Sequence, residues 1–323
     1  MRKDFCLCFN DGYVPYASVT IKSIMDNANA EDEIVIHVVS DYLSNDSLKF
    51  LKQWNVIFHI INDDSVFDGI DSSVWSVYTL YRLFLPKYLE PDIHKVLYLD
   101  CDVVVNDNLN ELFEIDMRDR AIAGCIDPQT YSEEVFTRLN YDIEKKYICA
   151  GVLLMNLDYW REHDLTDKVV EYMKSNPDKI AFLEQDALNF LCSENKIILP
   201  AEYGVQCSFL RDNRFLAEYI DSIENIVDNP KILHYAGYAP WIYCKNKSMH
   251  SYLWWGTYRS LKAFPMVKVD YVKSIIKYFG RYVLSKFHLI DSDNKFHINQ
   301  YYNHPKVTRK SVNRLIKEFT VNV

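Results

Sequence analysis

The feature that most constrains the fold is the alternation of apolar and amphipathic stretches in the first third of the chain. Short apolar runs at 5–9, 34–39 and 55–61 are separated by stretches whose apolar residues recur at helical spacing. Strand, helix and strand at this spacing are typical of right-handed βαβ units, whose strands are parallel. The sequence therefore predicts an α/β fold with a mostly parallel, mixed central sheet.

The pattern loosens after the run at 94–105, which is the most strand-like segment of the chain. Further strands are expected at 121–127 and 147–157, and helices at 79–89, 158–175 and 182–193. No internal repeat or low-complexity linker interrupts the pattern. We therefore expect one α/β domain over residues 1–250.

The net charge of −9 conceals a strong asymmetry along the 323 residues. Residues 257–323 carry 13 Lys or Arg and 4 Asp or Glu, so the rest of the chain has a net charge of −18. An acidic body disfavours nucleic acid as a partner, because phosphate contacts need clustered Lys and Arg. The eight glycines form neither G-x-G-x-x-G nor G-x-x-x-x-G-K-[ST], so both glycine-rich phosphate loops are excluded.

The C-terminal part, residues 251–323, is expected to form a separate basic, aromatic and helical extension. Apolar residues recur at three-to-four spacing over 269–287 and again over 306–319, with Lys and Arg on the other side. One interpretation is a helix pair that packs on the body and exposes a solvated basic face. The alternative is that residues 257–323 contact anionic lipid head groups at a membrane surface.

Cysteine usage and the N-terminus predict the compartment. None of the eight cysteines forms C-x-x-C, and several lie in apolar runs, which favours reduced, buried thiols over disulfides. The N-terminal segment lacks the apolar core of a signal peptide, and no stretch approaches the length of a membrane span. We expect a cytoplasmic protein, with peripheral contact to the inner face of the plasma membrane as the alternative.

The strongest chemical signal is Asp100-Cys101-Asp102 at the end of the run KVLYLD. Two acids at i and i+2 share one face of an extended segment, and at the carboxyl end of a strand they enter the crevice where α/β sheets bind ligands. A divalent cation would relieve their repulsion. Two other interpretations stay open: the acids merely end a strand, or they form the D-x-D-x-[TV] motif of haloacid-dehalogenase-type phosphatases. The chain has no Gly followed by Asp, which those phosphatases need.

Further polar residues follow other predicted strands or begin helices, and each taken singly is more often structural than functional. They are Arg82, Asp127, Glu184, Gln185, Asp186 and His234.

Together with the acid pair, these residues lie in motifs that resemble bacterial glycosyltransferase family 8. The motifs are KVLYLDCDVVVNDNLNELFEIDM, AGCID, AGVLLMNLDYWREHDL, EQDALN and LHYAGYAPW, in the order and spacing of that family, and the resemblance spans residues 4–243. It implies a GT-A type nucleotide-sugar transferase fold and a retaining transfer of glucose or galactose from a UDP-hexose. Related enzymes act on lipopolysaccharide or lipooligosaccharide, so the implied acceptor is a saccharide of a cell-surface glycolipid or polysaccharide.

The resemblance also implies roles for individual residues. Asp100, Asp102 and His234 would bind Mn²⁺, with Mg²⁺ as the alternative, and the metal would bridge both phosphates of UDP. Uracil and ribose would lie against Cys8, Asn10, Asp11 and Tyr13. The catalytic group would comprise Arg82 at the donor sugar and phosphate, Asp127 at sugar hydroxyls and Gln185 beneath the anomeric carbon. Glu184 or Asp186 would hold other sugar hydroxyls, and Cys101, Cys149, Ala150 and Gly237 would complete the donor site.

Two departures from the family pattern bear on activity. Cys149 stands where the family often has Asn, and the loop HYAGYAPW lacks the Lys that precedes Pro in the family and helps to neutralise the leaving diphosphate. Lys245 or Lys247 could replace that Lys. A catalytically weak or inactive UDP-sugar-binding homologue is therefore an alternative to the transferase, as is a glycogenin-like enzyme that modifies its own Tyr.

Overall fold

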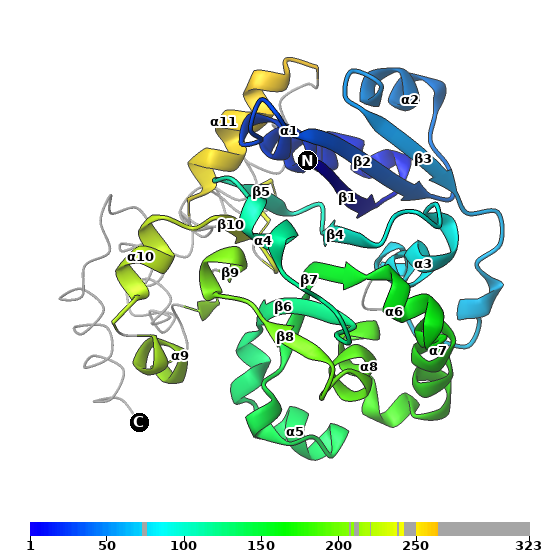
Figure 1. Ribbon diagram of the computed structural model, residues 1–323, viewed down its shortest axis with the longest axis vertical. Coiled ribbons are helices and arrows are strands. Elements are labelled where there is room, and N and C mark those ends of the chain that lie inside the picture. Colours follow the sequence, from blue (N-terminus) through cyan, green and yellow to red (C-terminus); the bar gives the residue numbers. More distant parts are fainter. Residues whose placement is uncertain are drawn as a thin grey trace, which may run out of the picture.

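The computed structural model describes residues 1–72, 76–206, 208–209, 213–219, 221–237, 239–241 and 250–263. Its main sheet has seven strands in the order β3-β2-β1-β4-β7-β6-β8, which can be followed from top to bottom in Figure 1. The strands are β1 (Arg2–Cys8), β2 (Glu33–Ser40), β3 (Val56–Ile60), β4 (Lys95–Leu99), β6 (Ile122–Ile126), β7 (Ile148–Asn156) and β8 (Lys196–Ile198). β7 runs antiparallel to both its neighbours, and the other neighbouring pairs are parallel. The predicted mostly parallel mixed sheet is confirmed.

Helices cover both faces of this sheet because its strands are apolar on both faces. In β1, Phe5 and Leu7 pack on one face, and Cys6 and Cys8 pack on the other. The first face is covered by α1 (Val14–Asp26), α2 (Asn45–Leu51) and α4 (Asn110–Glu114). The second face is covered by the 3-10 helix η3 (Val77–Phe84) and by α3 (Leu85–Tyr88), α6 (Leu157–Glu162), α7 (Leu165–Ser175) and α8 (Glu184–Leu191).

A second sheet of three strands lies beside the first, in the order β5-β10-β9. Its strands are β5 (Val103–Val105), β9 (Val205–Gln206) and β10 (Ile232–His234), and a third apolar cluster surrounds it. Further helices are α5 (Glu133–Leu139), α9 (Asn213–Glu218), α10 (Ile223–Asp228) and α11 (Ser251–Leu261). Short 3-10 turns are η1 (Asp11–Tyr13), η2 (Ser65–Phe67), η4 (Pro128–Tyr131), η5 (Ile143–Lys145), η6 (Pro177–Lys179) and η7 (Ala201–Tyr203).

The expected single strand at 94–105 is wrong in one respect, because it is two strands in different sheets. β4 ends at Leu99, and β5 begins at Val103, so the acid pair lies in the turn between the sheets. Backbone hydrogen bonds fix both ends of this turn: Asp100 N–H donates to Gly151 O at 2.9 Å, and Tyr235 N–H donates to Asp102 O at 2.9 Å. The Thr20 hydroxyl of α1 donates to the Val103 carbonyl at 2.7 Å.

The expected helix at 158–175 is likewise two helices, α6 and α7. They are separated at Asp164, whose φ of 48° is left-handed and interrupts the helical backbone. The segment at 79–89 is helical as expected, although most of it is the 3-10 helix η3. The helices expected over 269–287 and 306–319 lie outside the described residues.

The first helix of the C-terminal part packs on the body. α11 lies beside α1 (Figure 1), and its Trp254 and Tyr258 join the third apolar cluster. The division at residue 250 stays a prediction. Among the described residues, no helix combines the length and apolar character that crossing a membrane requires. Six described cysteines, Cys6, Cys8, Cys101, Cys125, Cys149 and Cys192, are free thiols and buried, whereas Cys207 and Cys244 lie outside the described residues.

Candidate functional site

A cavity of about 650 Å³ opens where β1, β4, β6 and β10 end and β7 begins. The carboxyl ends of parallel strands are where ligands of α/β sheets bind. The cavity lining includes these residues expected at the site: Cys8, Asn10, Tyr13, Arg82, Asp100, Cys101, Asp102, Asp127, Cys149, Ala150, Glu184, Gln185, His234 and Gly237. The structure therefore brings together most of the predicted site from seven segments of the chain.

Asp11 and Asp186 are not part of the lining. Asp11 is turned toward α2, where its Oδ1 accepts from Ser44 N–H at 2.8 Å. Asp186 is completely buried and bound by protein groups. Lys245 and Lys247 lie outside the described residues, so their expected role stays a prediction.

The acid pair and the distant histidine converge at the centre of the cavity. One ligand atom each from Asp100, Asp102 and His234 lie within 4.8 Å of one another. His234 Nε2 is 3.2 Å from Asp102 Oδ1 and 3.6 Å from Asp100 Oδ2. Burial alone would lower the pKa of His234, but the Asp102 carboxylate raises it well above its ordinary value. These groups therefore form a negatively charged pocket around an imidazole.

Asp100 is held so that one oxygen remains available. Its Oδ1 accepts from the Tyr98 hydroxyl at 2.7 Å and from the Arg82 guanidinium at 3.1 Å, which leaves Oδ2 facing His234. Burial would raise the pKa of Asp100, but Arg82 and His234 lower it, so the carboxylate is ionised. Arg82 itself is buried, lies over the Tyr98 ring at 4.2 Å and also pairs with Glu184 at 3.1 Å.

The departure at Cys149 has a visible role. Its Sγ is 3.5 Å from Nδ1 of His234. Burial raises the pKa of the Cys149 thiol. The sulfur beside Nδ1 therefore helps to orient the ring so that Nε2 faces the two carboxylates.

Gly151 leaves room for this cluster. A Cβ on Gly151 would come 2.6 Å from Asp100 Oδ2 and would overlap the His234 ring. Two carboxylate oxygens and one imidazole nitrogen, with no side chain at position 151 to crowd them, fit a divalent metal ion. The donor set includes nitrogen, which suits Mn²⁺ better than Mg²⁺.

The first turn of α8 carries the remaining acids. Glu184 is buried in the lining, and its Oε2 has no hydrogen-bond partner within the described part of the chain. Burial raises its pKa. The Asp186 carboxylate accepts from Ala181 N–H at 2.7 Å, from Phe182 N–H at 2.8 Å and from the Tyr147 hydroxyl at 2.7 Å. It thereby holds the turn that presents Glu184.

That turn is strained at Leu183, which has φ of 47° although it is not glycine. Such a conformation costs about 1–3 kcal/mol and persists only where surrounding contacts hold it. The strained residue directly precedes Glu184 and Gln185. Gln185 Oε1 accepts from Ala150 N–H at 2.8 Å, which places its amide at the cavity wall.

Two more polar groups face the cavity. The Asp127 carboxylate accepts from Gln129 N–H at 2.9 Å and from the Gln206 amide at 3.3 Å, and burial raises its pKa. Asn10 Oδ1 is buried and has no hydrogen-bond partner among the residues that the structure describes. Asn10 and Glu184 therefore each present a buried oxygen that a ligand could satisfy. Gly237 adopts φ of 70°, a backbone that glycine adopts without strain.

Sequence reasoning missed the residues that position the site: Thr20, Tyr98, Gly151 and Gln206. Tyr98 and Gly151 could have been suspected, since both lie within family motifs. Tyr98 precedes Asp100 by two residues, and Gly151 follows Ala150. Thr20 and Gln206 carry no local signal, because they reach the site only through the packing of α1 and β9.

Comparisons with known proteins point to one family of enzymes. A family model described as glycosyl transferase family 8 matches residues 5–244. A lipopolysaccharide 1,2-glucosyltransferase of Escherichia coli is 28% identical over 246 residues, covering 72% of this chain and 71% of the relative. A lipopolysaccharide 1,3-galactosyltransferase of Salmonella typhimurium is 24% identical over 263 residues, covering 77% of this chain and 73% of the relative.

Solved structures also include a glycosyltransferase of similar fold. The galactosyltransferase LgtC in complex with donor and acceptor sugar analogues superposes with a TM-score of 0.72 at 26% identity. The match covers 81% of this chain and 97% of that protein.

Proposed function

The chain belongs to glycosyltransferase family 8 and is a hexosyltransferase, and we propose that it moves glucose or galactose from a UDP-sugar to a saccharide acceptor in a metal-dependent, retaining reaction. Its GT-A type fold is confirmed by the likeness to LgtC. The single observation that carries the proposal is the convergence of Asp100, Asp102 and His234 in the cavity. The acceptor that we propose is a saccharide of a cell-surface glycolipid or polysaccharide, in keeping with the names of the relatives.

The metal ligands would be Asp100 Oδ2, Asp102 and Nε2 of His234. A bound Mn²⁺ would supply neutralisation of the charge that grows on the diphosphate as the sugar leaves. Tyr98 and Arg82 keep the Asp100 carboxylate turned to this position, and Cys149 keeps the His234 ring turned to it. Asn10 Oδ1 offers an acceptor for an N–H of uracil.

The donor sugar would lie against Glu184, Gln185 and Asp127. The unpaired Oε2 of Glu184 and the Asp127 carboxylate can accept hydrogen bonds from sugar hydroxyls. Gln185, the position expected beneath the anomeric carbon, is a neutral amide and a poor nucleophile. We therefore propose attack of the acceptor from the face that the diphosphate leaves, with a diphosphate oxygen taking the acceptor proton.

The direct experiment is to incubate the full chain with UDP-glucose or UDP-galactose and Mn²⁺ and to measure the release of UDP. We expect Asp102→Ala to abolish release, and EDTA to have the same effect on the unaltered protein. Asp68→Ala, which changes an exposed aspartate outside the cavity lining, is the matched control and should leave release unchanged. Turnover that persists in Asp102→Ala would overturn the metal assignment.

Three further measurements separate the alternatives. A phosphatase would release inorganic phosphate from small esters, and an inactive homologue would bind UDP-sugars without turnover across diverse acceptors. A self-glucosylating enzyme would gain mass in steps of one hexose when incubated with donor, which intact mass measures.

Peripheral membrane contact through residues 257–323 stays a proposal, since most of these residues lie outside the described ones. It is supported by their excess of Lys and Arg. Association with vesicles that contain phosphatidylglycerol, but not with pure phosphatidylcholine vesicles, is the expected result at low salt. Equal binding to both vesicles, or to neither, would count against it.

A further inference from the structure

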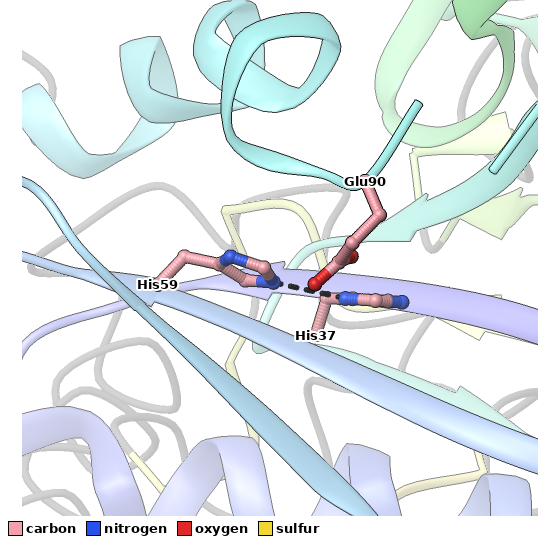
Figure 2. Close-up of side chains that lie close together, drawn as sticks. All are labelled: His37, His59 and Glu90. Atoms are coloured by element: carbon pink, nitrogen blue, oxygen red, sulfur yellow. Dashed lines mark hydrogen bonds between the residues drawn. The ribbon is translucent and has the colours of Figure 1, made fainter. Parts of the chain in front are cut away.

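A second cluster of potential metal ligands lies outside the cavity (Figure 2). His37 comes from β2, His59 from the neighbouring strand β3, and Glu90 from the segment after α3. One ligand atom from each residue lies within 4.8 Å of the others. His37 is completely buried, His59 is nearly so, and Glu90 is exposed, so the cluster is open to solvent on the Glu90 side.

The His37 nitrogen that faces away from His59, Nε2, carries a proton. Its Nε2 is 2.9 Å from Asp4 Oδ1. Asp4 also forms an ion pair with Arg2 at 2.9 Å, and a carboxylate can only accept hydrogen bonds. The hydrogen on His37 is therefore held at Nε2, and in the neutral ring Nδ1 is a lone pair.

His59 turns its Nε2 toward His37. Its Nε2 lies 2.9 Å from His37 Nδ1.

His37 Nδ1 thus presents its lone pair to His59 Nε2 at 2.9 Å, with the Glu90 carboxylate beside them. Either a proton on His59 Nε2 or a cation bound by both nitrogens satisfies this contact. A proton would need only the two nitrogens, whereas a metal ion also uses the third ligand that Glu90 presents.

We propose that His37, His59 and Glu90 bind a divalent transition-metal ion of the Zn²⁺ class. Two imidazoles and one carboxylate form a donor set that such ions prefer, and Asp4 supplies the carboxylate that orients a ligating histidine. An ion about 2.1 Å from both nitrogens fits the 2.9 Å spacing at an angle of about 90°, and tetrahedral binding needs the two nitrogens to separate by about 0.5 Å.

The site would tie an edge of the fold together. β3 is one of the two edge strands of the seven-stranded sheet, and it would be joined through the ion to β2 and to the segment after α3. This metal site shares no residue with the cavity cluster, so it does not depend on the proposed function.

The experiment uses the full chain carrying Asp102→Ala, which removes the cavity cluster as a competing site. After treatment with EDTA, the protein is titrated with Zn²⁺ alone, and binding is followed by calorimetry and by the melting temperature. We expect one Zn²⁺ per chain and a rise in melting temperature. Glu90→Gln and His59→Gln should each weaken Zn²⁺ binding by at least about tenfold, and Asp4→Asn by about 10–100-fold.

His94→Gln is the matched control, since His94 is an exposed histidine that pairs with Asp158. It should bind Zn²⁺ as tightly as the parent. Circular dichroism of the metal-free variants checks that each is folded, and Glu90→Gln tests the site without disturbing a buried residue. The absence of Zn²⁺ uptake, equal affinity in Glu90→Gln and His94→Gln, or an NMR signal for a proton shared by His37 and His59 at saturating Zn²⁺ would each overturn the proposal.

Discussion

Gly151 lies where β7 passes beneath the cluster formed by Asp100, Asp102 and His234. Any side chain there would occupy the space of the Asp100 carboxylate and the His234 ring. The requirement is steric, since no positive φ is recorded for this glycine. The absence of a side chain at position 151 is therefore a requirement of the site.

We predict that Gly151→Ala lowers UDP release by about a hundredfold, because displacing catalytic groups by about 1 Å costs that much. It should also weaken Mn²⁺ binding, measured by calorimetry. The control is Gly256→Ala, in a helix and with nothing near its Cβ position. It should keep full activity and raise the free energy of unfolding by up to about 1 kcal/mol. Unchanged Mn²⁺ affinity in Gly151→Ala would contradict the assignment.

Glu184 and Asp186 were equal candidates for the donor sugar, and their surroundings now separate them. Glu184 has an unpaired oxygen in the lining, whereas Asp186 accepts hydrogen bonds from two backbone N–H groups, Tyr147 and Arg138. The first residue is placed to touch a ligand, and the second is placed to hold the turn that carries it.

We therefore predict opposite effects for the two acids. Glu184→Gln should reduce UDP release by about 10–100-fold, equivalent to the 1.5–3 kcal/mol of a hydrogen bond to a charged group. It should lower stability less than Asp186→Ala does, because the Gln amide oxygen can still accept from Arg82. Asp186→Ala should lower the free energy of unfolding by about 3–5 kcal/mol, because it leaves Arg138 without its buried partner. UDP-release kinetics and urea unfolding of both variants test this prediction. A large loss of stability in Glu184→Gln together with none in Asp186→Ala would refute it.

At the scale of elements, α11 belongs to the packing of the body. Trp254 is fully buried, and its ring lies 5.1 Å from Trp241 and 5.0 Å from Tyr258. Tyr16 of α1 stacks on Trp241 at 4.3 Å. Because Tyr13 and Trp241 also line the cavity, this aromatic group connects α11 to the wall of the site.

We predict that Trp254→Ala lowers the free energy of unfolding by about 3–5 kcal/mol, the usual cost of removing a buried aromatic ring. Urea unfolding measures this loss. Tyr252→Ala, which removes an exposed ring from the same helix, should change stability by less than about 0.5 kcal/mol. Similar losses in the two variants would show that α11 does not pack as described.

At the scale of the whole molecule, Lys196 of β8 makes stability depend on pH. Its ammonium group is largely enclosed and lies near the Tyr141 hydroxyl and the Lys146 carbonyl. Burial lowers the pKa of Lys196 to about 7. The folded chain therefore releases this proton at a lower pH than the unfolded chain does.

We predict that Lys196 raises the free energy of unfolding as pH rises from about 7 to about 10. In this window the unfolded state binds more protons than the folded state, so stability increases with pH, by an amount on the order of a few kcal/mol. This gain in the free energy of unfolding is lost again as pH falls toward 7. Urea unfolding of the parent and of Lys196→Met at several pH values isolates this effect, and identical slopes in the two proteins would contradict it.

Local patterns predicted the sheet because burial on both faces leaves continuous apolar runs, and amphipathic spacing marks the helices between them. They also placed the acid pair at a strand end, since Asp100 directly follows β4. The family motifs added the remaining site residues, and most of these line the cavity. These features are local, so a few neighbouring residues suffice to reveal them.

Tertiary structure decided what depends on residues that are distant in the chain. It divided the run at 94–105 between two sheets, because β5 pairs with β10 rather than extending β4. It packed Asp100 and His234 so close to position 151 that only glycine fits there. It also placed Glu184 in the cavity lining and Asp186 outside it. It also brought His37 and His59 together through the register of β2 and β3. Distances of a few ångströms between such residues arise only when the chain has packed, and no local pattern encodes them.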